Sequence, residues 1–236
     1  GSNISDERYF AQIVERLFEI VARVRDESNV EIEFMNIGGG FGVPYKPEEK
    51  SLDIELVAKL VREVFDNSCK KFGLKEPQLM AEPGRYVTAD TGWLVGKVVV
   101  IKDSYKKFIG IDASSNDMPR PSIYGAYHYV TVVKKGGQDV PGNEPEKVSI
   151  VGSICENNDQ FAKDRLLPKC DIGDIVVIHN CGGHAYAMGH NYNGKLRHAE
   201  YLLAENGELR MIRRAESFED LYRTVCRQAG AQLTKS

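Results

Sequence analysis

The first third of the chain alternates between helical and extended apolar patterns, and this order constrains the fold more than any other feature. Apolar residues recur every three or four positions from Phe10 to Val24 and from Ile54 to Phe65, which predicts two amphipathic helices. Ser51 is a plausible N-cap for the second helix. Residues 30–37 (VEIEFMNI) and 78–81 (QLMA) have the pattern of short strands. Strands joined by helices are typical of a parallel α/β sheet or barrel.

After Thr91 the pattern changes to short β-rich runs separated by turn residues. The runs cover residues 93–102, 107–112, 129–134, 147–151, 174–179, 199–204 and 209–213. Turn sequences between them include Gly136-Gly137, Pro141-Gly142-Asn143 and Glu205-Asn206-Gly207. This alternation favours an antiparallel sheet or barrel. Ser217 predicts the N-cap of a last helix over Phe218–Gln228. We therefore expect two domains, over residues 1–92 and 93–236.

Composition excludes several classes of protein. Among 236 residues, 31 Lys and Arg face 34 Asp and Glu, and this net charge of −3 argues against a nucleic-acid binder. The longest apolar stretches are far shorter than the ~20 residues of a membrane helix, and the N-terminus has no secretory signal pattern. The five cysteines are irregularly spaced, which fits a reducing cytoplasm better than a disulfide framework. We expect a cytoplasmic protein that binds neither nucleic acid nor a membrane.

A run of glycines follows the first expected strand, at Gly38, Gly39, Gly40 and Gly42. Glycines let backbone N–H groups come close to an anion, because no Cβ is in the way. The run lacks the third glycine of a dinucleotide fingerprint, since Val43 stands there, and no Gly-Lys-Ser/Thr follows as in a P-loop. Two interpretations remain at this point, a phosphate-binding turn and a tight turn between a strand and a helix.

The turn Glu82-Pro83-Gly84-Arg85 ends the second expected strand. In a parallel barrel, the C-terminal ends of the strands form the active-site face. A carboxylate and a guanidinium on a stiff Pro-Gly turn could therefore bind a cofactor through groups of both charges. A local ion pair between Glu82 and Arg85 is the alternative.

Two later segments carry thiol and imidazole groups. Cys155 and Glu156 follow a β-rich run, where the thiol could act as an acid, and a buried, inert cysteine is the common alternative. Residues 179–190 (HNCGGHAYAMGH) contain one C-x-x-H spacing, at Cys181 and His184, but no second ligand pair. This pattern favours a glycine-rich pocket wall over structural zinc, and we expect no metal.

Taken in order, these segments resemble the diaminopimelate decarboxylases, members of the alanine-racemase/ornithine-decarboxylase-like (fold type III) pyridoxal-phosphate enzymes. The segments that carry the resemblance are 36–42 (NIGGGFG), 82–85 (EPGR), 112–128 (DASSNDMPRPSIYGAYH), 155–156 (CE) and 191–193 (NYN). The resemblance runs across nearly the whole chain, and five ordered motifs are far more specific than any one of them.

The resemblance implies an α/β part followed by a β part. Residues 1–92 would be the C-terminal part of a pyridoxal-phosphate-binding (β/α)8 barrel. Residues 93–236 would be an antiparallel β-domain, a barrel or sandwich with a terminal helix. The implied reaction removes one carboxyl group from meso-2,6-diaminopimelate, a small amino acid, to give L-lysine and CO₂ in the last step of lysine biosynthesis. A cytoplasmic homodimer with composite active sites is also implied.

The resemblance assigns one set of residues to the cofactor, pyridoxal 5'-phosphate. The amides of Gly38, Gly39 and Gly40 would hold the phosphate, and Glu82 would pair with the pyridine nitrogen and keep it protonated. Gly84, Arg85 and His184 complete the expected cofactor contacts. In enzymes of this kind the cofactor serves as an electron sink, while the protein supplies orientation and electrostatics.

A second set of residues is assigned to the substrate. Arg85, Arg120 and Tyr124 would bind the far carboxylate, a task that suits the forked guanidinium. Glu156 would bind the far ammonium. Cys155 would be the acid that reprotonates the carbon, and in the family it reaches in from the partner subunit.

The sequence departs from the family pattern in several places. The lysine that binds the cofactor and a histidine that stacks on its ring have no counterpart here, so we expect a portion of a longer enzyme that is inactive by itself. His184 stands where the family usually has tyrosine, and we keep it as a contact because a histidine can donate a hydrogen bond to an anion. Asn36 and Ser114 replace the common aspartate and glycine.

Two other functions remain open. A related decarboxylase could act on another amino acid, such as carboxynorspermidine. A non-catalytic relative could act through protein contacts alone.

Overall fold

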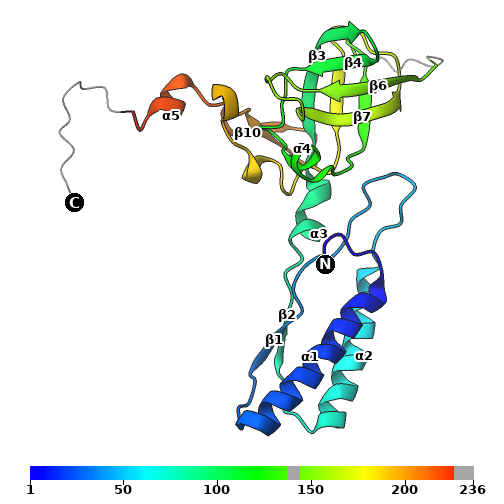
Figure 1. Ribbon diagram of the computed structural model, residues 1–236, viewed down its shortest axis with the longest axis vertical. Helices are drawn as coiled ribbons and strands as arrows, with labels where there is room; N and C mark the ends of the chain where they lie inside the picture. Colours follow the sequence, from blue (N-terminus) through cyan, green and yellow to red (C-terminus); the bar gives the residue numbers. More distant parts are fainter. Residues whose placement is uncertain (138–143, 226–236) are drawn as a thin grey trace, which may run out of the picture. The chain divides into compact units, whose positions relative to one another are not determined.

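The computed structural model describes residues 1–137 and 144–225, which divide into two compact units (Figure 1). The first unit comprises residues 1–94, 127–131 and 178–184, and the second comprises 95–126, 132–177 and the segment from 185 onward. Two short stretches from the later half of the sequence thus belong to the first unit, and one of them contains His184. The division into domains at residues 92 and 93 stays a prediction.

The first unit alternates helix and strand. Helices α1 (Glu7–Ser28) and α2 (Ile54–Phe72) pack side by side (Figure 1). Strands β1 (Phe34–Asn36) and β2 (Gln78–Met80) form a parallel pair. This confirms the alternation predicted from the apolar patterns, although β1 is shorter than the segment expected for it.

Aspartates begin both long helices. The Asp6 carboxylate accepts a hydrogen bond from the N–H of Arg8, and the Asp53 carboxylate accepts one from the N–H of Leu56. The prediction that Ser51 caps α2 is wrong, because Asp53 occupies the cap position two residues later. A carboxylate there also interacts favourably with the positive end of the helix dipole.

The helices bury their apolar faces against each other and against β1. Phe10, Val14 and Phe18 of α1 are fully buried, and the Phe18 ring meets the Phe65 ring of α2 edge-to-face at 5.3 Å. Phe10 also stacks on Phe41, which lies within the glycine run, with the ring centroids 4.1 Å apart. Each such side chain stabilises the fold by about 1.5–3 kcal/mol when it leaves water. The core therefore extends directly under the glycine run.

Two short helical turns follow β2. Helix α3 spans Gly84–Thr88 and the 3₁₀ turn η1 spans Ala89–Thr91. The sequence patterns did not indicate α3, since a five-residue helix is too short to show an apolar stripe. Its first two residues are Gly84 and Arg85, so the predicted turn is the start of a helix.

A mixed sheet, most of whose residues belong to the second unit, has the strand order β5-β8-β3-β4-β6-β7. The strands are β3 (Leu94–Asp103), β4 (Lys107–Ile111), β5 (Val130–Val133), β6 (Glu146–Val151), β7 (Gln160–Leu167) and β8 (Ile175–Ile178). The pairs β3–β4 and β6–β7 are antiparallel, and β4–β6 is parallel. Side chains such as Ile109, Ile150 and Val176 are fully buried in its core.

Strand β7 was not predicted. Its sequence, QFAKDRLL, places charged residues among the apolar ones, and the burial along the strand does not alternate strictly. Helix α4 (Arg120–Tyr124) was missed for the same reason as α3, because five residues are too few for a periodic pattern.

A separate antiparallel pair, β9 (Glu200–Leu203) and β10 (Leu209–Arg213), precedes the last helix, as the runs 199–204 and 209–213 predict. Helix α5 spans Phe218–Tyr222 and begins with the predicted Ser217 cap, which forms a capping box with Asp220. The helix ends at Tyr222 instead of continuing to Gln228, whose position lies outside the described residues. The predicted Pro141-Gly142-Asn143 turn also lies outside them.

No helix among the described residues is both long enough and apolar enough to span a bilayer.

Candidate functional site

The glycine run and the Glu82 turn lie next to each other, because they follow two paired parallel strands. The N–H of Ile37 donates to the carbonyl of Met80 at 2.9 Å, and one step further the N–H of Glu82 donates to the carbonyl of Gly38 at 2.9 Å. The ladder between β1 and β2 thus continues into both turns. The carboxyl ends of parallel strands meet at one edge, where ligands usually bind in α/β folds.

The conformation and packing of the glycine run require the absence of side chains. Gly38 and Gly40 have φ of +75° and +88°, in the region that favours glycine. A Cβ on Gly39 would lie 2.5 Å from the carbonyl oxygen of Glu82, whereas the Cβ position of Gly38 faces open space. The run is therefore tightly packed on one side and open on the other, as a phosphate-binding turn requires.

The Glu82 carboxylate is held by a neighbour on β1. Asn36 donates from Nδ2 to Glu82 Oε1 at 2.6 Å, while Asn36 Oδ1 accepts the N–H of Gly38 at 2.8 Å. In the part of the chain that the structure describes, Glu82 forms no salt bridge with Arg85, so the local ion pair considered above is not present. The exposed carboxylate can instead meet a positively charged ring nitrogen.

Arg85 is turned toward the start of the chain. Its guanidinium donates to Ser2 Oγ at 3.0 Å and lies over the Tyr45 ring, 5.9 Å from the centroid. Its Nε is buried and has no hydrogen-bond partner among the described residues. A buried donor without a partner is destabilising, so this N–H can donate to an anionic ligand without losing an existing bond.

His184 follows a glycine pair that packs on the end of α3. The N–H of Gly182 donates to the carbonyl of Ala89 at 3.0 Å, and a Cβ on Gly183 would lie 2.5 Å from Thr88 Oγ1. His184 itself has a positive φ of +61° and is exposed. The glycine-rich wall predicted for this segment is thus in contact with the helix that begins at Gly84.

The segment that leads to Arg120 is a buried polar loop in the second unit. Asp117 accepts hydrogen bonds from the N–H of Ser114 and from His198 Nδ1, both at 2.8 Å. Burial acts to raise the pKa of Asp117, but these two hydrogen bonds together with the charges of His198 and Lys195 outweigh it, and the pKa lies below its ordinary value. Arg120 is only 7% exposed, whereas Tyr124 at the end of α4 is exposed.

Cys155 and Glu156 lie on the loop between β6 and β7, and both are exposed. This excludes a buried, inert cysteine at position 155. The Glu156 carboxylate accepts the N–H of Asn158 at 3.1 Å, which leaves its second oxygen available to a ligand.

Cys181 and His184, which form the C-x-x-H spacing, are not part of a candidate metal-binding group among the described residues. Across residues 1–137 and 144–225, no group of three or more His, Cys, Asp or Glu side chains could hold a metal ion. Cys181 is buried and donates from Sγ to the carbonyl of Ile178 at 3.2 Å.

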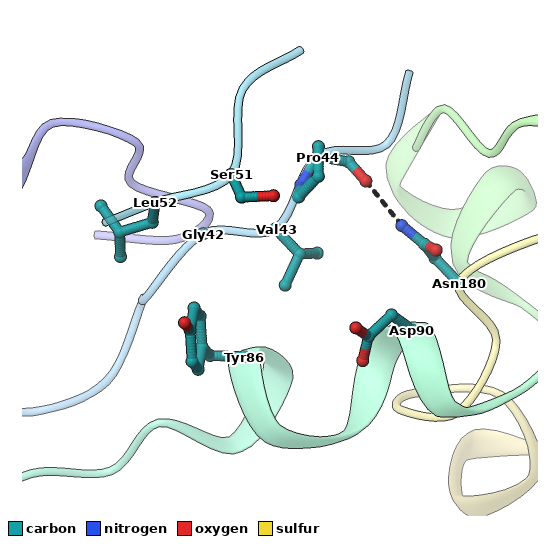
Figure 2. Close-up of a pocket in the computed structure, with 8 residues that line it drawn as sticks. All are labelled: Gly42, Val43, Pro44, Ser51, Leu52, Tyr86, Asp90 and Asn180. Carbon is teal, nitrogen blue, oxygen red and sulfur yellow. Dashed lines mark hydrogen bonds between the residues drawn. The ribbon is translucent and has the colours of Figure 1, made fainter. Parts of the chain in front are cut away.

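A cavity of about 230 Å³ in the first unit escaped the sequence analysis (Figure 2). Its lining residues are Gly42, Val43, Pro44, Ser51, Leu52, Tyr86, Asp90 and Asn180. Tyr86 and Asp90 point toward the Val43–Pro44 stretch from α3 and η1, and Asn180 donates to the Pro44 carbonyl at 2.7 Å (Figure 2). The segment after β1 thus contains the glycine run and also forms one wall of this cavity.

Comparison with known families assigns the chain to a class. Residues 51–182 match the C-terminal sheet domain of the pyridoxal-dependent decarboxylases, and residues 1–89 match the pyridoxal binding domain of the same enzymes. The chain belongs to this family of decarboxylases, whose cofactor is pyridoxal phosphate. The glycine run, the Glu82 carboxylate and the unpartnered Arg85 Nε offer the groups that a phosphate and a ring nitrogen need.

Particular relatives narrow this class. A diaminopimelate decarboxylase of Methanothermobacter thermautotrophicus is 41% identical over 94% of this chain and 51% of that protein. Protein TabA of Pseudomonas amygdali pv. tabaci is 40% identical over 87% of this chain and 47% of its own length. A crystal structure of diaminopimelate decarboxylase from M. jannaschii has a TM-score of 0.85 and 34% identity over 97% of this chain and 51% of that one. The chain therefore spans about half the length of the relatives that it matches.

These matches confirm the resemblance that the ordered motifs carry, and with it the class of fold. The roles of the individual site residues stay predictions. Sequence analysis assigned no individual role to Ser2, Asp117, Asp159 or His198, because their contacts with the site segments form only when the chain is folded. Asp117 lies within the 112–128 segment and Asp159 lies shortly after Glu156, whereas Ser2 and His198 lie outside every motif.

Proposed function

We propose that this chain works as part of a longer enzyme that removes a carboxyl group from meso-2,6-diaminopimelate to give L-lysine and CO₂. The observation that carries the proposal is the hydrogen bond from the Glu82 N–H to the Gly38 carbonyl, which joins an anion-binding turn to a carboxylate. Relatives that carry the name diaminopimelate decarboxylase support this choice of substrate. One of the similar crystal structures is a complex with L-lysine.

In this proposal the first unit holds the cofactor. The amides of Gly38, Gly39 and Gly40 bind the phosphate, with Gly84, Arg85 and His184 as further contacts. Glu82 keeps the pyridine nitrogen protonated, and Asn36 fixes the orientation of that carboxylate. The bound cofactor supplies an electron sink for the charge that remains on carbon when CO₂ leaves.

The substrate is recognised through the charges at its far end. Arg120 and Arg85 bind the far carboxylate through paired N–H groups, and Tyr124 adds a hydroxyl. Glu156 binds the far ammonium. Cys155 is exposed and can deliver a proton from Sγ to the α-carbon.

The test is lysine production by the full-length protein that contains this chain, supplied with pyridoxal phosphate and meso-diaminopimelate. We expect L-lysine and CO₂ in equal amounts, and the absence of both products would end the proposal. An Arg120→Ala variant should lose this reaction. If the protein instead acts on carboxynorspermidine and tolerates Arg120→Ala, the related decarboxylase is the correct function.

Comparing the isolated 236 residues with the full-length protein distinguishes a catalytic from a non-catalytic role. We expect no cofactor absorbance that shifts on addition of substrate, because no lysine of this chain matches the family's cofactor-binding lysine. A non-catalytic relative would give the same result in the full-length protein, where we expect the shift.

The proposal includes a cytoplasmic homodimer with composite sites. Four cysteines of the described residues are free thiols, which fits a reducing compartment. Sedimentation of the full-length protein measures the oligomeric state, and mixing Cys155→Ala with an Arg120→Ala variant tests for composite sites. Recovery of activity in the mixture requires that two chains contribute to one site.

A further inference from the structure

The carboxylate of Asp159 connects two loops of the second unit. Its Oδ1 accepts a hydrogen bond from the N–H of Ser115 at 2.6 Å, and its Oδ2 accepts one from the N–H of Ile154 at 2.9 Å. Ser115 lies in the loop after β4, Ile154 lies in the loop after β6, and Asp159 stands directly before β7. One side chain thus bridges two loops that are far apart in the sequence.

This carboxylate is almost completely buried, with Asp159 only 3% exposed. No salt bridge within residues 1–137 and 144–225 includes Asp159, so backbone N–H groups stabilise the carboxylate. Hydrogen bonds to an ionised acceptor are shorter and stronger than neutral ones. A buried carboxylate needs such partners to offset the loss of water. The burial therefore makes each of the two hydrogen bonds important.

Gly152 leaves the space that the Asp159 carboxylate occupies. A Cβ on Gly152 would overlap both carboxylate oxygens of Asp159. Gly152 does not have a positive φ, so lack of space and not backbone conformation requires the glycine. Its N–H also donates to the Asp159 carbonyl at 2.8 Å. Gly152 and Asp159 thus form a matched pair.

Both bridged loops lead to residues proposed for the substrate. The loop of Ser115 runs into Arg120 at the start of α4, and Ile154 directly precedes Cys155. The Asp159 N–H also donates to the Glu156 carbonyl at 3.1 Å, which closes a turn from Glu156 to Asp159. Asp159 therefore contacts the supports of both sets of residues at once.

We propose that Asp159 is a positioning residue that fixes the Arg120 loop relative to the loop of Cys155 and Glu156. This inference rests on the proposed function, which assigns both loops to the same reaction: the Arg120 loop serves the site of its own chain, and Cys155 serves the site of the partner. Small displacements of binding groups reduce reaction rates strongly, because the reacting geometry is lost. A weaker second connection exists, in which Ser153 Oγ donates to the Ala113 carbonyl at 3.1 Å. Loss of Asp159 should thus loosen the loops without unfolding the sheet.

The test uses an Asp159→Asn variant of the full-length protein loaded with pyridoxal phosphate. The amide replaces one acceptor oxygen with an NH₂ group that faces a backbone N–H, so one bridge is lost. We expect faster amide hydrogen exchange in both segments 113–119 and 152–158. We also expect kcat/KM for diaminopimelate to fall about 10- to 100-fold. Exchange in the sheet strands should be unchanged.

Two further variants keep the test decisive. Gly152→Ala displaces the Asp159 carboxylate but leaves its charge unchanged, so this variant should increase exchange in the same two segments. It tests the bridge even if Asp159→Asn fails to fold. Asp103→Asn makes the same chemical change at an exposed aspartate of β3, and exchange and kinetics should match the unaltered protein. In the unaltered protein, the amides of Ser115 and Ile154 should exchange as slowly as amides of β6.

The two readouts separate this inference from the proposed function. Hydrogen exchange requires no turnover, so it tests the bridge even if the protein does not decarboxylate diaminopimelate. If exchange is unchanged in either segment of the variants, the proposed bridge is wrong. Faster exchange in both segments with an unchanged kcat/KM overturns the positioning role.

Discussion

Asn36 Nδ2 lies 2.6 Å from Glu82 Oε1, and this bond joins the last residue of β1 to the residue that begins the turn after β2. The other end of the same amide accepts the N–H of Gly38, so both ends of the Asn36 side chain have a partner and only one orientation of the amide satisfies them. One carboxylate oxygen of Glu82 is thus held, and the other is left for a ligand.

Replacing Asn36 with leucine should weaken cofactor binding. Leucine has a similar volume but cannot orient the Glu82 carboxylate or accept the Gly38 N–H. We expect the Kd for pyridoxal phosphate to rise about tenfold in the full-length protein, corresponding to the loss of one charge-assisted hydrogen bond. Absorbance titration measures this. Asn67→Leu, at an exposed position of α2, is the control, and equal affinities for both variants would contradict the role of Asn36.

The Asp117 carboxylate should stabilise the second unit in a pH-dependent way. Its pKa is lower in the folded chain than the value of about 3.9 expected when unfolded. The stabilisation is therefore present above that pH and is lost as the pH falls through the folded pKa. Asp117→Asn should be less stable than the unaltered chain at pH 6, with a difference that shrinks toward pH 2. Urea unfolding across this range measures it, and a constant difference would contradict the assignment.

The described cysteines should differ sharply in their reaction with iodoacetamide. Cys155 is exposed, whereas Cys170 is 1% exposed and burial raises the pKa of its thiol to about 11. Only the thiolate reacts quickly, so Cys155 should be modified and Cys170 spared at pH 8 in the folded protein. Peptide mass spectrometry identifies the modified residue. Modification of Cys170 at the rate of Cys155 would show that this part of the fold opens readily.

Lys134 should contribute more to stability than an exposed basic residue. Its Nζ donates to Asp174 Oδ2 at 2.7 Å, and the Asp174 side chain is only 3% exposed. Lys134→Ala leaves a buried carboxylate without its cation, although two backbone N–H groups still bind it. We expect a loss of about 2–3 kcal/mol in the free energy of unfolding.

The matched control for Lys134 is Arg23→Ala on α1. Arg23 and Glu27 form an exposed pair with 3.6 Å between Nε and Oε1. Such pairs contribute below about 0.5 kcal/mol. Denaturant unfolding of both variants provides the comparison, and similar losses would contradict the importance of burial at Asp174.

Periodicity and turn chemistry were sufficient to predict the two long helices and most of the strands. The apolar stripe around Phe10 and Phe18 predicted α1, and the Ser217 capping position predicted the start of α5. Short elements such as α4 escaped because five residues cannot show a period. Strand β7 escaped because its charged residues obscured the pattern.

The site was predictable where residues adjacent in sequence form it. The Gly38–Gly40 run and the Glu82 turn each carried a recognisable pattern, and parallel pairing brings the two together. Contacts such as Asp159 with Ser115, or Arg85 with Ser2, join residues that are distant in the sequence. The type of a residue alone does not identify such a partner. They depend on the folded backbone, which local patterns do not describe.

The lack of space between Gly39 and the carbonyl of Glu82 has a consequence for anyone who recombines segments of related enzymes. A crossover placed between these two turns would combine the glycine run of one parent with the Glu82 turn of the other. A misfit of a few tenths of an ångström would then close the space proposed for the phosphate. The segment from residue 36 to residue 85 should therefore be inherited as one block.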